Sequence, residues 1–463
     1  MSGSGADTVD DGHGTGGDRE PVDDAGGAAG DGRARRPGRR RGTAVLAGIT
    51  AAWLATGLAL VWLDWPGSAE PEDSPHAGGV WEEITPAPLS ERFGTGTVWA
   101  GDRLVVWSGV AAEGGEAYRY GEPLTDGAVW TPSGEWLPMA APPGGLALAP
   151  GGFAQWDGGE VLFGPVTATS GHGGHGPGDG SVGGLLAYDP VADSWRGIPL
   201  SEGKLTADAG VGEPPHTAVV AGGELIIGHS YAVTTDSGEP GVVAVDPADG
   251  TTRLLDPGPY AAPEAPEVRE DDQEAREDDP DAREGDPAAP GTVSLVAAPE
   301  RVVAVSGDGS EIWVLAPGSG EWTRAAAPPR PGVGRSSAGV AAGGTVLFLD
   351  DGGSHAYDIA ADRWRELAGP PSAGDDAADR IGYRWTGDVA LAPGRAYDPA
   401  ADRWAEVPRL PLEEGDRLSG PYVGWTGDAL VVFGGGRAPC PAEGTCDVPD
   451  AVPETLAGWV YVN

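Results

Sequence analysis

Pairs of short apolar runs recur along the chain from residue 80 onward, and a turn that usually contains glycine joins the two runs of each pair. The runs are rich in valine, leucine and aromatic residues, and a tight turn between two such runs is a strong local signal for a β-hairpin. The pattern therefore predicts seven hairpins. They span 94–109, 151–164, 216–228, 293–307, 337–353, 382–394 and 421–436.

A third apolar run follows each hairpin, and in most repeats a turn and a fourth run come after it. A tryptophan opens most of the fourth runs, whereas Thr252 takes this place in the third repeat. Four short antiparallel strands per repeat make one blade of a β-propeller. Because the tryptophans recur at one position of the repeat, we expect them to pack within the blades. The third runs span 128–132, 185–190, 242–247, 312–317, 355–359, 395–399 and 458–462. The tryptophans are Trp136, Trp195, Trp322, Trp364 and Trp404.

The two ends of the repeat region complement each other. The last repeat, 421–463, has a hairpin and a third run but no fourth run, whereas a lone run with Trp81, at 79–88, has no hairpin before it. An open ring would leave two unpaired β edges, and closure by strands from both ends removes them. We therefore predict that 80–463 is an all-β, seven-bladed propeller closed by its N-terminal strand.

One phrase recurs almost unchanged in three repeats. It reads LAYDPVADSW at 186–195, HAYDIAADRW at 355–364 and RAYDPAADRW at 395–404. Together with glycine pairs that close second strands, such as Gly434-Gly435, the phrase resembles kelch-repeat propellers, an architecture shared with the central domain of galactose oxidase. The repeat of about 54 residues is near the kelch period of about 50. The resemblance implies a kelch-like fold that binds proteins or glycans through loops at the blade faces.

The sequence before the repeats changes character twice. Residues 1–42 form a Gly- and Asp-rich tail with a basic run at its end, and the tail lacks the apolar side chains of a packed core. Residues 43–63 carry no charge and have the length of a helix that crosses a bilayer. The basic run ends in Arg39, Arg40 and Arg41, and basic residues mark the cytoplasmic side of a span. We predict a disordered cytoplasmic tail, a transmembrane helix at 43–63, a linker at 64–79 and an extracellular propeller.

A cleaved signal peptide is the alternative interpretation of 43–63. Its apolar core would be unusually long and about 42 residues would precede it, so an uncleaved signal anchor fits the pattern better. The protein is then a single-pass protein of the cell membrane with its N-terminus in the cytoplasm. The single lysine, Lys204, among many arginines is typical of a GC-rich bacterial gene.

The formal net charge of −42 argues against nucleic acid as a partner, because phosphate contacts require clustered Lys and Arg. The charge favours solubility and contact with cations or basic surfaces. Part of it lies in an acidic insertion at 260–290, where a seven-residue repeat runs over 269–289. Charge blocks of this kind are usually solvated and disordered. Loose Ca²⁺ binding is the alternative, but the spacing of an EF-hand is absent.

Candidate ligands and nucleophiles are few. His172 and His175 have H-x-x-H spacing, but only Asp179 lies nearby as a third ligand, so the spacing does not predict a zinc site. Cys440 and Cys446 lie in one short loop and outside the membrane would form a disulfide, with two free thiols as the alternative. Their shared loop does not support the Tyr–Cys cofactor of a copper-radical oxidase. We therefore predict no catalytic residue, no cofactor and no metal site.

A tryptophan also precedes the first turn of several hairpins. These residues are Trp99, Trp156, Trp385 and Trp425. Their return at one position of the repeat predicts packing between blades and not a carbohydrate platform.

The sequence as a whole predicts a membrane-anchored, extracytoplasmic binding module without a catalytic role, whose ligand is a protein or a glycan. An enzyme with its site at the axial mouth of the propeller is the rival prediction. No set of His, Cys or paired carboxylates recurs at loop positions on one end, which disfavours it. A transmembrane sensor is the third interpretation, but the tail at 1–42 has no motif that could fold.

Overall fold

In the computed structural model the chain divides into two compact units, Met1–Pro71 and Glu72–Asn463. The described residues belong to the second unit. They are 76, 78–112, 123–168, 184–200, 218–228, 242–255, 293–306, 309–334, 339–350, 353–371, 381–413, 416–439 and 455–462.

Several predicted features lie outside the described residues and stay predictions. They are the tail 1–42 with Arg39, Arg40 and Arg41, the span 43–63, most of the linker 64–79, His172 and His175, the acidic insertion 260–290, and Cys440 and Cys446. Within the described ranges, no helix has the length and apolar character needed to cross a membrane.

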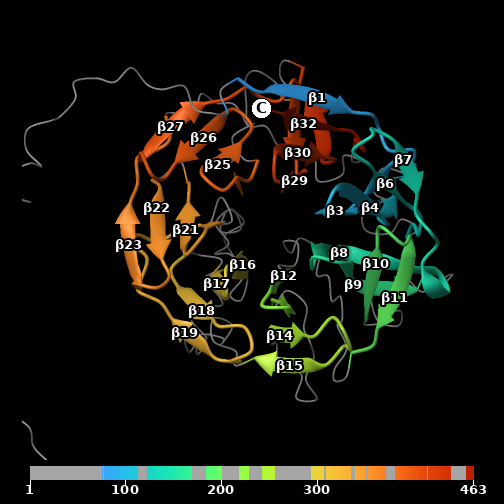
Figure 1. Ribbon diagram of the computed structural model, residues 1–463, viewed down its shortest axis with the longest axis horizontal. Coiled ribbons are helices and arrows are strands. Elements are labelled where there is room, and N and C mark those ends of the chain that lie inside the picture. Colours follow the sequence, from blue (N-terminus) through green and yellow to red (C-terminus); the bar gives the residue numbers. More distant parts are fainter. Residues whose placement is uncertain are drawn as a thin grey trace, which may run out of the picture. The chain divides into compact units, whose positions relative to one another are not determined.

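Seven four-stranded antiparallel sheets stand around a ring and form the blades of a propeller (Figure 1). Each predicted hairpin supplies the two inner strands of one blade, and each predicted third run supplies the next strand outward. The prediction of an all-β, seven-bladed propeller is confirmed. We number the blades from the first complete hairpin.

Blade 1 consists of β3 (Gly96–Ala100), β4 (Arg103–Trp107), β6 (Gly127–Trp130) and β7 (Trp136–Pro138). Blade 2 consists of β8 (Leu146–Trp156), β9 (Val161–Ala168), β10 (Leu185–Asp189) and β11 (Ser194–Ile198). Blade 3 consists of β12 (Ala218–Ala221), β13 (Glu224–Ile227), β14 (Val242–Val245) and β15 (Thr252–Leu255). Blade 4 consists of β16 (Val293–Ala298), β17 (Arg301–Ser306), β18 (Ile312–Leu315) and β19 (Trp322–Arg324).

Blade 5 consists of β20 (Val340–Ala342), β21 (Thr345–Phe348), β22 (His355–Asp358) and β23 (Arg363–Glu366). Blade 6 consists of β24 (Arg384–Trp385), β25 (Ala390–Ala392), β26 (Arg395–Asp398) and β27 (Arg403–Glu406). Blade 7 consists of β29 (Tyr422–Trp425), β30 (Ala429–Phe433), β32 (Gly458–Val462) and β1 (Val80–Ile84).

The N-terminal strand closes the ring, as the sequence predicts. β1 pairs antiparallel with β32, and the register runs from Val80 opposite Val462 to Ile84 opposite Gly458. β1 is the outermost strand of blade 7, and β32 lies between it and the hairpin (Figure 1). Strands from the two ends of the repeat region therefore complete one sheet, which removes the exposed β edge of β32.

The apolar core of the ring divides into seven clusters, one at each junction between neighbouring blades. The second strand of a blade is covered on both faces. In blade 7 this strand is β30, with the sequence ALVVF, and it is buried along its whole length. This burial explains why the hairpins read as continuous apolar runs and not as alternating ones. At the junction of blades 7 and 1, Ile84 and Phe433 of blade 7 pack with Leu104 and Val106 of blade 1.

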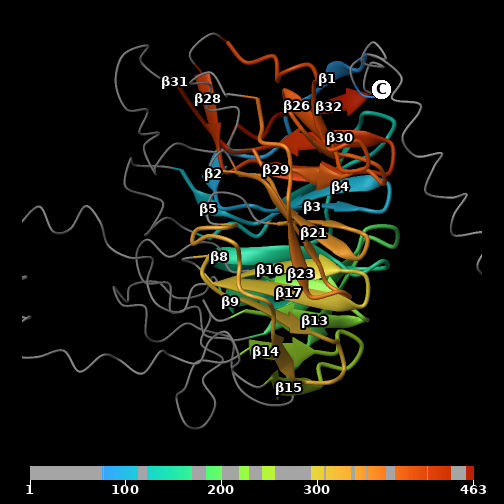
Figure 2. The same cartoon turned by 90° about the vertical axis from the view of Figure 1, so that its left-hand side faces the viewer.

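Two small ribbons extend the inner hairpins of blades 1 and 7. β2 (Arg92–Phe93) pairs with β5 (Val110–Ala111), and β28 (Asp416–Ser419) pairs with β31 (Gly436–Pro439). Both ribbons lie on one side of the ring, which we call the loop end (Figure 2). The opposite side, the turn end, carries the tight turns between first and second strands. Among the described residues the helical content is one short turn, η1 (Pro143–Gly145).

Candidate functional site

The repeated phrase forms the turn between the third and fourth strands of a blade. In blade 6 the hydroxyl of Tyr397 donates to Oδ1 of Asp402 at 2.6 Å. Asp402 has φ +48°, in the left-handed region that aspartate tolerates better than most residues. The tyrosine thus fixes this unusual turn. The equivalent bonds join Tyr188 to Asp193 and Tyr357 to Asp362, each at 2.8 Å.

The residues of the phrase also form hydrogen bonds with the preceding blade. Oδ1 of Asp402 accepts a hydrogen bond from the backbone N–H of Ala368 at 2.8 Å, and Nε1 of Trp404 donates to the Ala368 carbonyl oxygen at 2.8 Å. The N–H of Ala368 and the Tyr397 hydroxyl lower the pKa of Asp402, and burial raises the pKa of Tyr397. The residues that recur most regularly in the sequence therefore join neighbouring blades.

The tryptophans that the sequence singled out follow one rule around the ring. In five of the blades the indole N–H donates to the carbonyl oxygen four residues after the tryptophan of the preceding blade. The pairs are Trp136 with Thr85 (2.7 Å), Trp195 with Ala140 (2.7 Å), Trp364 with Ala326 (2.9 Å), Trp404 with Ala368 (2.8 Å) and Trp81 with Pro408 (2.9 Å).

Trp322 departs from this rule. Its side chain is buried in the cluster between blades 3 and 4, and its Nε1 has no hydrogen-bond partner among the described residues. The preceding blade has Thr252 at the tryptophan position. The irregular repeat that the sequence indicates therefore changes how blade 4 is joined to blade 3.

A groove at the turn end follows the junction of blade 1 with blade 7, the blade that strands from both ends of the repeat region complete. Its volume is about 600 Å³, within the usual range of ligand pockets. Strands β1 and β32 line one side, and strand residues of blade 1 together with turns of both blades line the rest. The lining residues on which the argument rests are Glu82, Glu83, Trp99, Asp102, Trp130 and Asp428.

Two tryptophans form the aromatic part of this groove. Trp99 in β3 and Trp130 in β6 have ring centroids 6.2 Å apart and ring planes tilted by 54°. Contacts on two sides position Trp99, because its backbone N–H donates to the Tyr422 hydroxyl of blade 7 at 2.8 Å and its Nε1 donates to the Gly101 carbonyl oxygen at 2.7 Å. Both tryptophans are half-buried. Nε1 of Trp130 has no hydrogen-bond partner in the described part of the chain.

Four acidic residues line the groove together with the tryptophans. Glu82 and Glu83 come from β1, whereas Asp102 and Asp428 come from turns, and all four residues are exposed. Asp102 lies 3.3 Å from Nε of Arg103, which is outside the lining. No Lys or Arg is among the described residues that line the groove. Carboxylates and aromatic faces both attract cations, so the groove is suited to a positively charged group.

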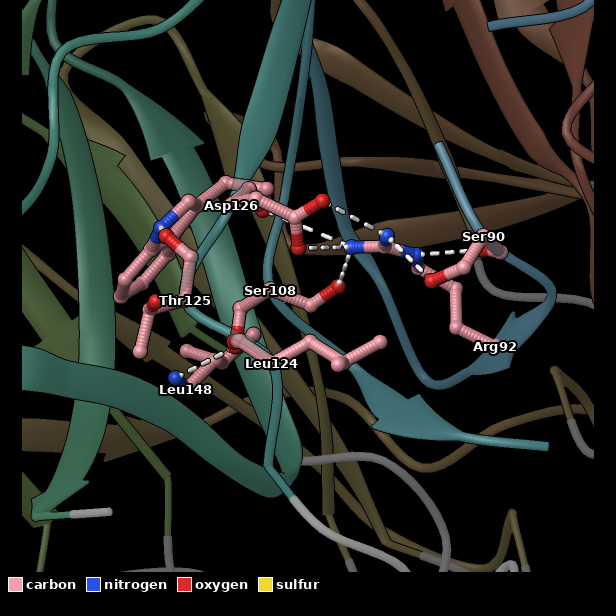
Figure 3. A network of polar contacts seen from close by, with 8 residues as sticks. Ser90, Arg92, Ser108, Leu124, Thr125, Asp126 and Leu148 are labelled. Atoms are coloured by element: carbon pink, nitrogen blue, oxygen red, sulfur yellow. Dashed lines mark hydrogen bonds and ion pairs between the residues drawn. The ribbon is translucent and has the colours of Figure 1, made fainter. Parts of the chain in front are cut away.

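At the loop end a buried arginine holds the ribbon of blade 1 (Figure 3). Arg92 in β2 is 0% exposed, and its two terminal nitrogens bind the carboxylate of Asp126 at 3.0 and 3.1 Å. It also donates to the carbonyl oxygens of Ser90 and Ser108, at 2.8 and 3.1 Å. Oγ of Ser108 in turn accepts the backbone N–H of Leu148 from blade 2 at 2.8 Å. A buried guanidinium requires such a set of acceptors, so this network is a structural support.

The residues that line the groove are far apart in the sequence. Trp99 packs with the apolar cluster between blades 7 and 1, and it also lines the groove. The contribution of Trp130 and of the carboxylates has no local signal in the sequence. Only the predicted closure, which places β1 beside blade 1, could have indicated that Glu82 and Asp102 share a surface. Within the described ranges, no three His, Cys, Asp or Glu residues are grouped so that they could hold a metal ion.

Comparisons with known proteins give a likeness of structure. No protein-family profile and no curated protein sequence matches the chain. Among solved structures, the chain is similar to YCF48 from Cyanidioschyzon merolae with a TM-score of 0.39 and 13% sequence identity. The match covers 83% of this chain and 98% of the other.

Proposed function

We propose that the propeller is a non-catalytic binding module whose ligand is a protein segment with basic side chains, held in the groove between blades 7 and 1. The observation that carries the proposal is the combination of Trp99 and Trp130 with four carboxylates in a lining without a basic residue. An ammonium or guanidinium group is attracted both by an aromatic face and by a carboxylate. The net charge of −42 favours the approach of such a ligand.

A glycan is the second candidate ligand. A saccharide ring can pack on the face of Trp99 while its hydroxyl groups donate to carboxylates such as Asp102, and both residues line the groove. Binding of a neutral glycan would depend little on salt, whereas binding of a basic peptide would weaken as salt screens the charges. The salt dependence therefore separates the two candidates.

We also propose that the module is a divergent kelch-type propeller carried outside the cell membrane by a single span. The uncharged run at 43–63 with Arg39, Arg40 and Arg41 before it supports the anchor and its orientation. The phrase at 395–404 supports the kelch type, as does the pair Gly434-Gly435 after β30, where both residues have positive φ, +71° and +82°.

Binding of hexalysine to the full chain, measured by calorimetry at two salt concentrations, tests the ligand class. Replacing Glu82 and Glu83 together by Gln should raise the dissociation constant at least tenfold. The matched control replaces Glu300 and Glu321 of the blade 4 turns by Gln, which changes the net charge equally and should change the constant less than twofold. Equal losses in both double variants would overturn the proposal, because the peptide would then respond only to total charge.

A neutral cello-oligosaccharide is the second probe. Binding that is insensitive to salt and is lost in Trp99→Ala, in a chain that does not bind hexalysine, would assign the groove to a glycan. Protease treatment of intact cells tests the location. Digestion of the propeller is the expected result, and protection of 80–463 would overturn the orientation.

A further inference from the structure

Blades 2 and 3 share an ion pair at one corner of the blade, where the beginning of the outer strand lies near the beginning of the second strand. Arg253 of β15 binds both carboxylate oxygens of Glu224 of β13 through Nη2, at 2.8 and 2.9 Å. In blade 2, Arg196 of β11 is paired with Glu160 through Nε at 3.3 Å and through Nη2. In both blades the arginine is the second or third residue of the outer strand, and the glutamate begins or directly precedes the second strand.

Blade 5 has the arginine of this pair but not the glutamate. Arg365 has the place in β23 that Arg253 has in β15, and Thr345 opens β21 as Glu224 opens β13. Arg365 forms no hydrogen bond or ion pair with the other described residues. A cavity of about 370 Å³ lies in this corner. It is lined by Thr345, Ala356, Asp358, Arg363, Trp364 and Arg365.

The cavity has a net positive lining in an acidic protein. Two guanidinium groups, those of Arg363 and Arg365, face one carboxylate, that of Asp358. The Asp358 carboxylate is already engaged, because Oδ1 accepts the backbone N–H of Ala361 at 2.9 Å and Oδ2 lies 3.8 Å from Arg363. Asp358 therefore does not replace the missing glutamate.

The next blade does not replace it either. Asp402 of blade 6 attracts Arg365, but no hydrogen bond or ion pair joins their side chains, and Oδ1 of Asp402 binds the Tyr397 hydroxyl and the N–H of Ala368. The N–H groups of Arg365 thus remain open to an external acceptor. A guanidinium presents two parallel N–H groups that match the two oxygens of a carboxylate.

We propose that the cavity of blade 5 binds a carboxylate-bearing ligand, whose carboxylate takes the place that the Glu224 side chain has in blade 3. Arg365 binds the carboxylate through two N–H groups, Arg363 adds a second positive charge, and Thr345 offers a hydroxyl. The site lies on another blade than the groove and selects the opposite charge. It therefore stands independently of the proposed function.

Titration of the full chain with acetate, followed by the broadening of the acetate methyl NMR signal at constant ionic strength, tests the site. Thr345→Glu supplies the missing carboxylate and should raise the acetate dissociation constant at least tenfold. The reciprocal variant, Glu224→Thr, opens the same corner in blade 3 and should double the number of acetate molecules bound. Arg365→Gln should lose binding with an unchanged circular dichroism spectrum, which separates loss of the site from loss of the fold.

Three results would overturn the proposal. The first is a wild-type chain that does not bind acetate, and the second is a T345E chain that binds it as tightly as the wild type. The third is inorganic phosphate that binds more tightly than acetate, which would assign the cavity to a phosphoryl group.

Discussion

Nε1 of Trp81 donates a hydrogen bond to the carbonyl oxygen of Pro408 at 2.9 Å, across 327 positions of the sequence. Trp404 forms the same bond with Ala368 at the junction before it. Trp81 also packs on Tyr461, its register partner in β32, with ring centroids 5.0 Å apart. The closing strand β1 therefore contacts blade 6 in the way that the fourth strand of blade 6 contacts blade 5.

Replacing Trp81 by Phe removes this hydrogen bond and keeps an aromatic ring. The Pro408 carbonyl oxygen also accepts the backbone N–H of Gly394 at 3.3 Å and keeps this partner, so W81F loses one hydrogen bond and should lower the free energy of unfolding in urea by about 1 kcal/mol. W404F removes the equivalent bond at an internal junction and is the matched control, with an expected loss at least as large, because the Ala368 carbonyl oxygen has no second donor among the described residues. Unchanged stability in W81F beside a destabilised W404F would show that this bond does not hold the closure.

Acid should weaken the junctions that Asp362 and Asp402 form. Backbone N–H groups, followed by tyrosine hydroxyls, lower the pKa of both carboxyls below the ordinary value of 3.8. Since the pKa is lowered in the folded state, the stabilisation is present above the unfolded-state pKa and is lost as the pH falls through the folded-state pKa. The loss should therefore appear below about pH 4.

The double variant Asp362→Asn, Asp402→Asn tests this pH dependence. Asparagine tolerates the left-handed backbone at both positions and does not titrate. Between about pH 4 and pH 2, its free energy of unfolding should fall less steeply than that of the wild type, by up to one proton per replaced carboxyl. Urea unfolding at a series of pH values measures the slope, and equal slopes would contradict the assignment.

The ring could be predicted from the sequence because its determinants are local and periodic. Apolar runs around glycine turns specify each hairpin, and tryptophans such as Trp364 and Trp404 recur once per blade because each blade repeats the same contact with its neighbour. The closure followed from an unmatched strand at each end of the repeats. The lone Trp81 carried that prediction, and its pairing with β32 confirms it.

The groove and the buried arginine could not be predicted in this way. The groove arises from the approach of β1 to blade 1, which brings Glu82 near Asp102 without any shared sequence pattern. Arg92 lies in a short polar segment typical of an exposed loop, and its partner Asp126 is 34 positions away. The burial of Arg92 depends on the ribbon of β2 and β5, which is too short to give a periodic signal.

Gly250 should be sensitive to substitution, because it takes the turn position that aspartate has in the repeated phrase. It has φ +78°, and a Cβ atom there would lie 1.8 Å from the carbonyl oxygen of Pro199. Proline has no N–H, so an aspartate at this position would also lack the donor that Ala368 offers to Asp402. Gly250→Ala should therefore lower the free energy of unfolding by about 3 kcal/mol, from backbone strain and the clash together.

Gly343→Ala is the matched control for this clash. Gly343 has a similar φ, +61°, but a Cβ atom there would meet nothing within 4 Å. Its replacement should cost only the backbone strain, about 1–2 kcal/mol. Equal losses in the two variants, measured by urea unfolding, would show that the close approach of Pro199 does not limit this turn.

The Arg92 network predicts that charge alone does not support the ribbon at the loop end. Arg92→Lys keeps the positive charge but loses the two-point contact with Asp126 and leaves the carbonyl oxygens of Ser90 and Ser108 without their donor. The Arg92 side chain is buried but the Asp126 side chain is 57% exposed, so the pair falls between an exposed and a buried one, and the expected loss is about 2 kcal/mol. Arg324→Lys is the control, because the Arg324 side chain is 63% exposed in its pair with Glu311, and it should cost less than about 1 kcal/mol. Urea unfolding of both variants measures the difference, and a loss in R92K no larger than in R324K would show that the network does not stabilise the fold.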